Sequence, residues 1–249
     1  MSPTSSRVGF PWMAVIIGLG VLASLYQIFW VAPSPWSGGP KPDYLGVDYK
    51  IFYFHVSSAA GALILFFVCS LVSVGYLVLR RMRGMAALAL RADRLCVAMA
   101  EVGVVFGLCV LISGPLWAKP AWGTYWTWEP RLTMALLCEF LFIGYLVLRS
   151  YGGSEETGRV ISAGVAVLGA PATYLTHVAV RLWGGNHPTV VTEGGGGLAS
   201  SEMQIAFALA LTSIGLLVIY LVHGRYRFHT LAAAIDDLYL DLDDLEESS

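Results

Sequence analysis

The amino-acid sequence predicts an all-α integral membrane protein with six transmembrane helices and both termini in the cytoplasm. Of its 249 residues, 57% are hydrophobic and 13% are charged, and the mean hydropathy is +0.68. A soluble domain carries roughly 25% charged residues, so the composition indicates lipid as the main solvent. The net charge of −2 provides no basic surface for nucleic acid, and we expect the lipid bilayer to be the large-scale partner.

Six apolar runs are long enough to cross the ~30 Å hydrocarbon layer as helices, which takes about 18 to 20 residues. In chain order they are 12–31, 51–79, 95–117, 132–148, 160–180 and 205–222. The first run exceeds the h-region of a signal peptide and no small-residue cleavage site follows it. We therefore expect it to be retained as a helix. The second is long enough to tilt or to begin outside the bilayer.

The basic residues predict the orientation. Ten Lys and Arg side chains fall on the side of the membrane that includes both termini, and five fall on the other. The positive-inside rule places the side with ten in the cytoplasm, and an even helix number also puts both termini on one side. Segments 32–50, 118–131 and 181–204 then face outward. With the helix ends, they carry seven of the eight tryptophans, namely Trp30, Trp36, Trp117, Trp122, Trp126, Trp128 and Trp183.

The chain divides into a six-helix domain, 1–229, and an acidic tail, 230–249. Seven of the 17 acidic residues lie between Asp236 and Glu247, among Leu, Ile and Tyr residues. This pattern is that of a short amphipathic helix, whose acidity disfavours anionic lipid. A solvated tail is the preferred interpretation, and a protein-binding tail is the alternative.

The cysteines and two absent motifs exclude several classes of protein. Cys69, Cys96, Cys109 and Cys138 all lie in predicted helices, so we expect no disulfide in the outer segments. The sequence has no C-x-x-C-H, which attaches haem covalently. It also has no G-x-x-x-x-G-K-[ST], so the chain is not itself a nucleotide-driven motor.

Residues 114–133, predicted as an outer loop, read GPLWAKPAWGTYWTWEPRLT and hold the densest aromatic cluster. An interfacial belt is one explanation, because indole rings anchor helix ends at the membrane surface. A belt needs only one or two anchors at each end, however. A flat apolar ligand with a polar edge explains the excess better, since indole faces stack on it and indole N–H groups reach its rim. The candidate contacts are Trp117, Trp122, Tyr125, Trp126 and Trp128.

Two histidines are predicted at the same level as this segment. His55 lies at the outer end of the second helix, and His187 precedes the sixth. Either histidine alone is more simply explained as an ordinary interfacial residue. Together, beside an aromatic surface, they suggest axial ligation of haem iron, for which neutral imidazole is a common ligand. His177 is a possible substitute, whereas we expect His223 and His229 to be solvated in the cytoplasm.

Outer cations are candidates to pair with the two haem propionates. Lys119, Arg131 and Arg181 lie on the outer side, and the planar fork of Arg131 suits a carboxylate best. The alternative for Arg131 is a pair with Glu129. Both interpretations stay open.

Residues 122–133 resemble the tryptophan-rich signature of the haem-handling membrane proteins of cytochrome c maturation. The length and the six predicted helices match the short branch, the haem exporter protein C (CcmC) family, whose longer relatives have more helices. The resemblance covers nearly the whole chain, including the lead-in 114–120 and the surroundings of His55 and His187. One difference is Glu129, where the family usually has Asp. Another is His177, where a smaller polar residue is expected.

The resemblance implies that haem b is bound transiently and non-covalently at the outer face of a bacterial inner membrane. It assigns axial ligation to His55 and His187, and haem contact to Trp122, Trp126 and Trp128. It also implies hand-off to a membrane-anchored haem chaperone, with two ABC transporter subunits and a small membrane peptide as further partners. We add Trp117, Tyr125, Glu129 and Arg131 as candidate haem-binding residues.

Three functions remain to be compared. A non-catalytic haem presenter is preferred. A lyase-like enzyme that joins haem to the chaperone lacks an evident nucleophile, and a transmembrane haem channel lacks histidines in the cytoplasmic half of the predicted spans. Glu101 and Glu139 lie within apolar runs. Intramembrane acids are functional candidates, but we favour protonated or paired carboxyl groups that aid helix packing.

Overall fold

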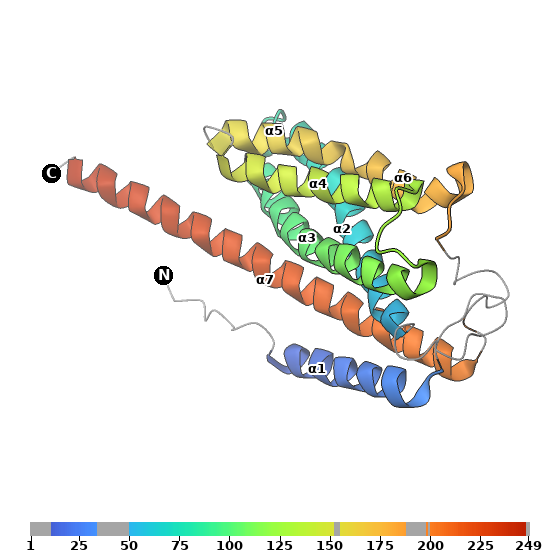
Figure 1. Cartoon of the computed structure of the whole chain (residues 1–249). Coiled ribbons are helices and arrows are strands. Elements are labelled where there is room, and N and C mark those ends of the chain that lie inside the picture. The colour runs from blue at the N-terminus through green and yellow to red at the C-terminus, as the bar shows by residue number, and fades with distance from the viewer. Residues whose placement is uncertain (1–10, 34–49, 152–154, 188–197, 199, 248–249) are drawn as a thin grey trace.

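The computed structural model describes residues 11–33, 50–151, 155–187, 198 and 200–247, and its regular elements there are all helices (Figure 1). Residues 34–49, which include Trp36, and residues 188–197 and 199 lie outside these ranges. The predicted outer segments 32–50 and 181–204 are therefore described only in part. In chain order the helices are α1 Pro11–Tyr26, the π-helix η1 Gln27–Val31, α2 Ile51–Leu79, α3 Ala86–Trp122, α4 Pro130–Tyr151, α5 Glu155–Val167, α6 Gly169–Trp183 and α7 Ser201–Glu247.

Among the described residues, six helical spans are long and apolar enough to cross a membrane, which confirms the predicted number. The first two have the predicted bounds, Trp12–Val31 and Ile51–Leu79. The fifth combines α5 and α6, Glu156–Trp183. The helix is interrupted at Leu168. The reason is Pro171, three residues later, which has no N–H to donate to the preceding turn of the helix.

The tryptophan-rich segment is not one continuous loop as expected. Residues 114–122 form the last turns of α3, although Pro115 and Pro120 lie inside them. Each proline removes only one backbone N–H, and the other backbone groups still need helical partners near lipid. The helix stops at Gly123, whose φ of 77° is left-handed and whose N–H donates to Lys119 O at 2.9 Å. Only residues 123–129 form the connection to α4.

The main buried cluster lies between α2, α3 and α4, with Ala166 of α5 and Val218 of α7 beside them. The rings of Phe66 and Phe142 stack there with centroids 4.1 Å apart. Gly169 allows α6 to approach, because a Cβ at this position would lie 2.5 Å from Phe142 Cζ and from Ser70 Oγ. On the other side of the bundle α1 packs on α7, where Ser24 Oγ and Ser213 Oγ are hydrogen bonded at 3.2 Å. Small residues bring membrane helices close together in this way.

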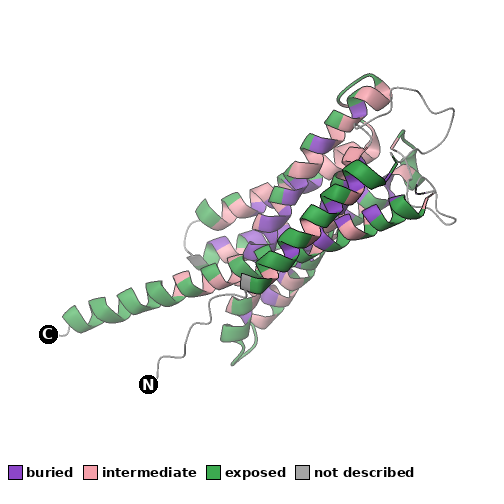
Figure 2. Cartoon of the chain, turned by 90° about the horizontal axis from the view of Figure 1, so that it is seen from below, coloured by how far each residue is buried: buried purple, intermediate pink, exposed green. Residues whose placement is uncertain are grey.

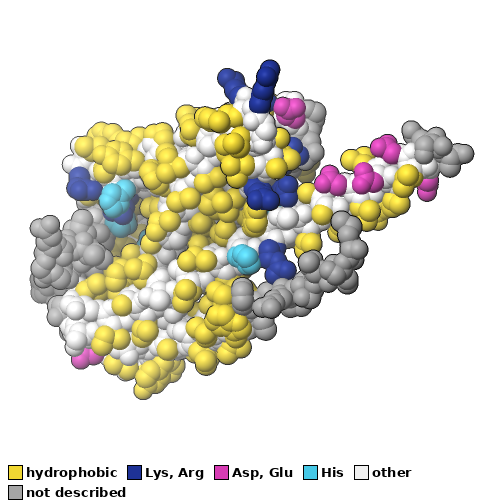
Figure 3. All heavy atoms as spheres, turned by 180° about the vertical axis from the view of Figure 1, so that it is seen from behind, with side chains coloured by type: hydrophobic (Ala, Val, Ile, Leu, Met, Phe, Trp, Pro, Cys, Tyr) yellow, Lys and Arg dark blue, Asp and Glu magenta, His cyan; other side chains and the backbone are white. Residues whose placement is uncertain are grey.

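The surface of the bundle is apolar. Buried residues lie along its interior and exposed residues on its outer faces (Figure 2). Large apolar side chains such as Leu19, Ile64 and Ile219 are more than half exposed, and hydrophobic side chains cover much of the face in Figure 3. Apolar surface of this extent needs lipid or protein around it. The chain is therefore a multi-pass membrane protein.

The bundle has two distinct ends. At one end of the bundle α3 stops at Trp122, α4 starts at Pro130 and α6 stops at Trp183. We call this end the tryptophan end. α1 begins and α7 stops on the side of the opposite end (Figure 1). The acidic tail is not a separate element, because α7 continues as one helix to Glu247.

A buried ion cluster joins three helices near the opposite end. Asp93 on α3 is 4% exposed, and its Oδ2 accepts a hydrogen bond from Arg149 of α4 at 3.0 Å. Arg159 Nε of α5 lies 3.6 Å from the same oxygen. A second ion pair, Arg80 to Glu156 at 2.7 Å, differs in that the Glu156 side chain is 75% exposed.

Asp93→Ala should lower the free energy of unfolding by about 3 kcal/mol, since it removes the buried anion that the half-buried guanidinium groups of Arg149 and Arg159 face. Glu156→Ala is the matched control, for which we expect a loss below about 1 kcal/mol because the pair is solvated. Thermal melting in mild detergent measures both. Equal melting temperatures for the two variants would contradict the structural role of the cluster.

Candidate functional site

A cavity of about 870 Å³ lies at the tryptophan end, between α2, α3, α4 and α6. On α3 its lining extends from Trp117 inward to Gly107, a rise of about 15 Å at 1.5 Å per residue. That is roughly half of the ~30 Å hydrocarbon layer. The polar and aromatic side chains that line it include His55, Trp117, Trp122, Trp126, Arg131, Glu139, Thr176, His177, Arg181 and His187.

His55 is held in one orientation by a buried serine. Its Nδ1 lies 2.9 Å from Ser113 Oγ. The Ser113 hydroxyl has one proton and donates it to Cys109 O at 2.6 Å, so the serine accepts the bond from His55 Nδ1–H. Nε2 then carries the lone pair, which is the arrangement that a metal-ligating histidine needs. Gly114 makes room for the ring, since a Cβ there would lie 3.2 Å from His55 Cε1.

His187 reaches the same cavity from the loop that follows α6. This loop is anchored by Glu129, whose Oε2 accepts a hydrogen bond from Asn186 N–H at 2.7 Å. Gly184 and Gly185 have φ of 75° and 147°, values that side chains rarely adopt. A Cβ at Gly185 would also lie 3.1 Å from Glu129 Oε2. Glu129, predicted as a haem contact, does not line the cavity, and its carboxylate holds the backbone of the loop that carries His187.

Three of the five predicted aromatic contacts line the cavity: Trp117, Trp122 and Trp126. The rings of Trp117 and Trp122 meet edge to face at 5.4 Å. Trp126 Nε1 is buried and has no hydrogen-bond partner among the described residues. A buried N–H without a partner lowers the stability of the folded protein. A hydrogen-bond acceptor on a ligand in the cavity would satisfy it.

Tyr125 and Trp128 do not line the cavity. Their side chains are 57% and 75% exposed. Trp128 packs edge to face on Trp126 with centroids 5.8 Å apart, and the Lys119 ammonium lies 5.3 Å from the centre of the Tyr125 ring. These two aromatic side chains form an outer rim beside the cavity.

Two cations face the cavity. Arg131 is in the first turn of α4 and Arg181 is in the last turn of α6, and both line the cavity. Within the part of the chain that the structure describes, neither guanidinium forms an ion pair within 4.0 Å. The expected alternative, a direct pair of Arg131 with Glu129, is thus not formed, and both guanidinium groups are available to an anionic ligand.

Glu139 lies at the inner end of the cavity. Its side chain is 2% exposed, and among the described residues neither carboxyl oxygen has a hydrogen-bond partner. Gly107 faces it, and a Cβ at that position would overlap the carboxyl group. The side chain is therefore accommodated by a glycine and has no ion partner among the described residues. Of the two explanations given above, a protonated or a paired carboxyl group, the structure favours the protonated one.

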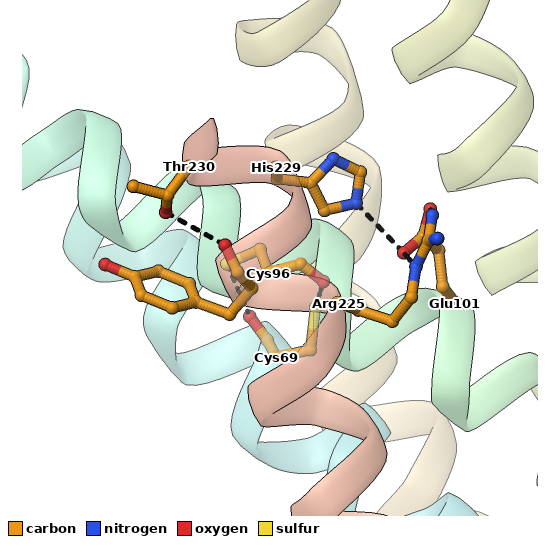
Figure 4. Close-up of polar contacts among 7 residues, drawn as sticks. Cys69, Cys96, Glu101, Arg225, His229 and Thr230 are labelled. Carbon is orange, nitrogen blue, oxygen red and sulfur yellow. Dashed lines mark hydrogen bonds and ion pairs between the residues drawn. The ribbon is translucent and has the colours of Figure 1, made fainter. Parts of the chain in front are cut away.

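Glu101 behaves differently and is paired (Figure 4). Arg225 of α7 donates two hydrogen bonds to its carboxylate, both at 2.7 Å, and His229 Nε2 lies 3.0 Å from Oε2. This corrects the expectation that His229 is merely solvated. Far from the tryptophan end α7 carries two histidines. His223 is exposed, and His229 is bound in this network, which joins α3 to α7.

Ser113 and Gly114 contact His55 and Gly107 contacts Glu139, and the sequence did not single out these three positions. Small residues in an apolar run look like ordinary packing positions, and only the helix partners reveal their roles. The signal that was available for Ser113 is its place beside the Gly114–Pro115 start of the aromatic segment.

Comparisons with known proteins identify the family of the chain. The family described as CcmC: Heme exporter protein C matches residues 3–238. Heme exporter protein C of Escherichia coli K12 is 33% identical over 181 residues, which are 71% of this chain and 66% of that protein. The protein of the same name from Bradyrhizobium diazoefficiens is 29% identical over 215 residues, 83% of this chain and 75% of the relative. That of Rhodobacter capsulatus is 28% identical over 180 residues, 72% and 68%.

Ser113→Ala should weaken haem binding by about 10- to 100-fold, the usual effect of removing the outer partner of a metal-ligating histidine. The reason is that His55 loses the acceptor that fixes its tautomer. Haem titration of the purified protein, followed by absorption, measures the change.

Ser57→Ala is the control, because Ser57 is equally buried on α2 but bonds only Tyr53 O, at 2.7 Å. If both serine variants bound haem like the parent protein, Ser113 would have no part in orienting His55.

Proposed function

The chain belongs to the haem exporter protein C family, and on that premise we propose that it binds haem in the cavity at the tryptophan end and presents it for delivery during c-type cytochrome maturation. Membership of this family implies a role in haem handling for cytochrome c maturation, in a transport or delivery component. One observation carries the proposal. His55 and His187, 132 positions apart, line a single cavity together with three tryptophans and two arginines.

In this proposal haem is cargo, held by side chains of complementary chemistry. The porphyrin supplies four ligands to iron, and imidazoles of His55 and His187 supply the two axial ones. Trp117, Trp122 and Trp126 pack against the apolar macrocycle. Haem b would thus be bound without a covalent bond to this chain.

The polar edge of haem has matching partners in the same cavity. Arg131 and Arg181 offer guanidinium groups to the two propionates, and Trp126 Nε1–H offers a further donor. Tyr125 and Trp128 at the rim are placed to contact the exposed edge of the bound haem. Glu129 acts indirectly, through the loop that carries His187.

We further propose that the tryptophan end faces the periplasm across a bacterial inner membrane. The support is the distribution of basic residues, ten against five. A membrane-anchored haem chaperone would receive the haem there, and two ABC transporter subunits and a small membrane peptide would be the other partners. A cavity that opens at the membrane surface suits release, since every 1.4 kcal/mol of added affinity slows dissociation about tenfold at a fixed association rate.

His55→Ala and His187→Ala should each lower haem retention by about tenfold or more and shift the Soret band, because one axial ligand is lost. Purification in mild detergent followed by absorption spectroscopy, with and without the chaperone, measures both effects. His223→Ala is the control, since His223 is exposed on α7 and does not line the cavity. Unchanged Soret bands in the double variant His55→Ala/His187→Ala would refute the ligand assignment.

One observation favours a second function, a haem path through the membrane. The cavity continues inward to Glu139, so haem entering from the bilayer interior would pass this acid. Glu139→Gln distinguishes the two functions, because glutamine keeps the shape but cannot ionise. If haem passes Glu139, the Glu139→Gln variant should load haem more slowly in cells. The purified variant should still bind added haem as the parent protein does.

We expect Glu139→Gln to leave both loading and binding unchanged. A carboxyl group without an ion partner in an apolar interior is most stable when neutral, and glutamine is the neutral equivalent. Haem content after expression and haem titration in detergent are the two measurements. Loss of cellular loading alone would favour the path.

A further inference from the structure

α7 extends beyond the rest of the bundle. It runs as one helix from Ser201 to Glu247 and projects past the ends of α3, α4 and α5 (Figure 1). Its last contacts with the bundle include the ion pairs of Arg225 and His229 with Glu101. From residue 234 to residue 246 every side chain is exposed (Figure 2). Residues 231–246 span about 24 Å at 1.5 Å per residue.

The projecting part carries an apolar stripe with coiled-coil spacing. Its members are three or four residues apart and lie on one face of the helix. We call this stripe the α7 seam. It consists of Phe228, Leu231, Ile235, Leu238 and Leu242, which are 55%, 59%, 54%, 58% and 47% exposed. Leu240 lies on the opposite face and is 64% exposed.

Acidic residues flank the α7 seam on both sides. At 100° per residue, Asp241 and Asp243 lie nearest the seam, one on each side, and Asp236, Asp237 and Asp244 lie further round the helix. Residues 230–247 contain seven acidic residues and no Lys or Arg. Hydrophobic and acidic side chains alternate along the projecting helix in Figure 3. A helix of this type pairs with an apolar helix whose flanking positions are Lys or Arg, because the flanking charges of a coiled coil choose the partner.

Two other occupants fit less well. A lipid surface is disfavoured, because the helix continues straight out of its span and does not lie in the interface, and because its acidic residues repel anionic headgroups. A second copy of this chain is disfavoured because it would bring two segments that carry seven acidic residues and no Lys or Arg against each other.

We propose that the α7 seam docks a Lys- and Arg-rich amphipathic helix of another protein, on the side of the membrane opposite the tryptophan end. The contact is a short two-stranded coiled coil over about two heptads. So short a helix pair is weak in isolation, so the partner is a subunit that is already held nearby, which raises its effective concentration. This interaction is independent of haem binding and uses none of the cavity residues.

Site-specific photo-crosslinking of the full chain in its native membranes tests the proposal. A photoreactive residue is introduced as Leu238→benzoylphenylalanine on the seam, or as Leu240→benzoylphenylalanine on the opposite face, and the crosslinked peptide is sequenced. We expect at least tenfold more crosslinking from position 238, to a Lys- and Arg-rich amphipathic segment of another protein. Crosslinks to lipid, to this chain or a second copy of it, to a segment that is not basic, or no crosslink at all would overturn it.

Charge reversal provides a second measurement. Asp241→Lys/Asp243→Lys, the acidic residues nearest the seam, should reduce the crosslink from position 238 about tenfold, whereas Asp237→Lys/Asp244→Lys, which makes the same charge change further round the helix, should not. Equal effects of the two would show that no specific charge pairing exists. The haem spectrum of each variant is recorded in parallel. It should stay unchanged, so a failure here is distinguishable from a failure of the haem proposal.

Discussion

The constraint on which this structure depends is that the hydrocarbon layer offers no hydrogen-bond partner to the backbone. Each segment that crosses it must be helical, and the helices continue until a residue allows them to stop outside it. α3 therefore runs through two prolines and ends at the left-handed Gly123. The same constraint makes every polar side chain inside the bundle consequential. Asp93 and Glu101 are matched by arginines, whereas Glu139 is met by a glycine.

The cavity arises from the way the helices end at the tryptophan end. α3 ends in helical turns that carry Trp117 and Trp122, α4 begins with Arg131, and α6 ends with Arg181. The two candidate ligands are held by different means. Ser113 fixes the His55 ring from the neighbouring helix, and Glu129 fixes the backbone of the His187 loop. One candidate ligand thus lies on a helix, and the other lies on a loop that a carboxylate of a different segment anchors.

The two ends of the molecule show different chemistry. The tryptophan end gathers indoles, imidazoles and cations around a cavity, which suits a flat anionic cargo. The opposite end gathers ion pairs and projects a helix with an acidic, apolar surface, which suits a protein. Arg225 and His229 of α7 hold the base of that helix against α3. Because α7 runs from one end to the other, it joins the two regions mechanically without contributing to the cavity lining.

Hydropathy and signature residues were enough to predict six spans, the density of tryptophans between the third and fourth spans, and the family, because apolar runs and short motifs are local properties of the chain. The helical form of residues 114–122 was missed because proline usually ends helices in water. Only the tertiary structure decided that Trp117, Trp122 and Trp126 face the cavity while Tyr125 and Trp128 form the rim. It also separated the paired Glu101 from the unpaired Glu139. These outcomes depend on how far each helix is rotated and how deeply it is placed against its neighbours, and packing between distant segments sets both.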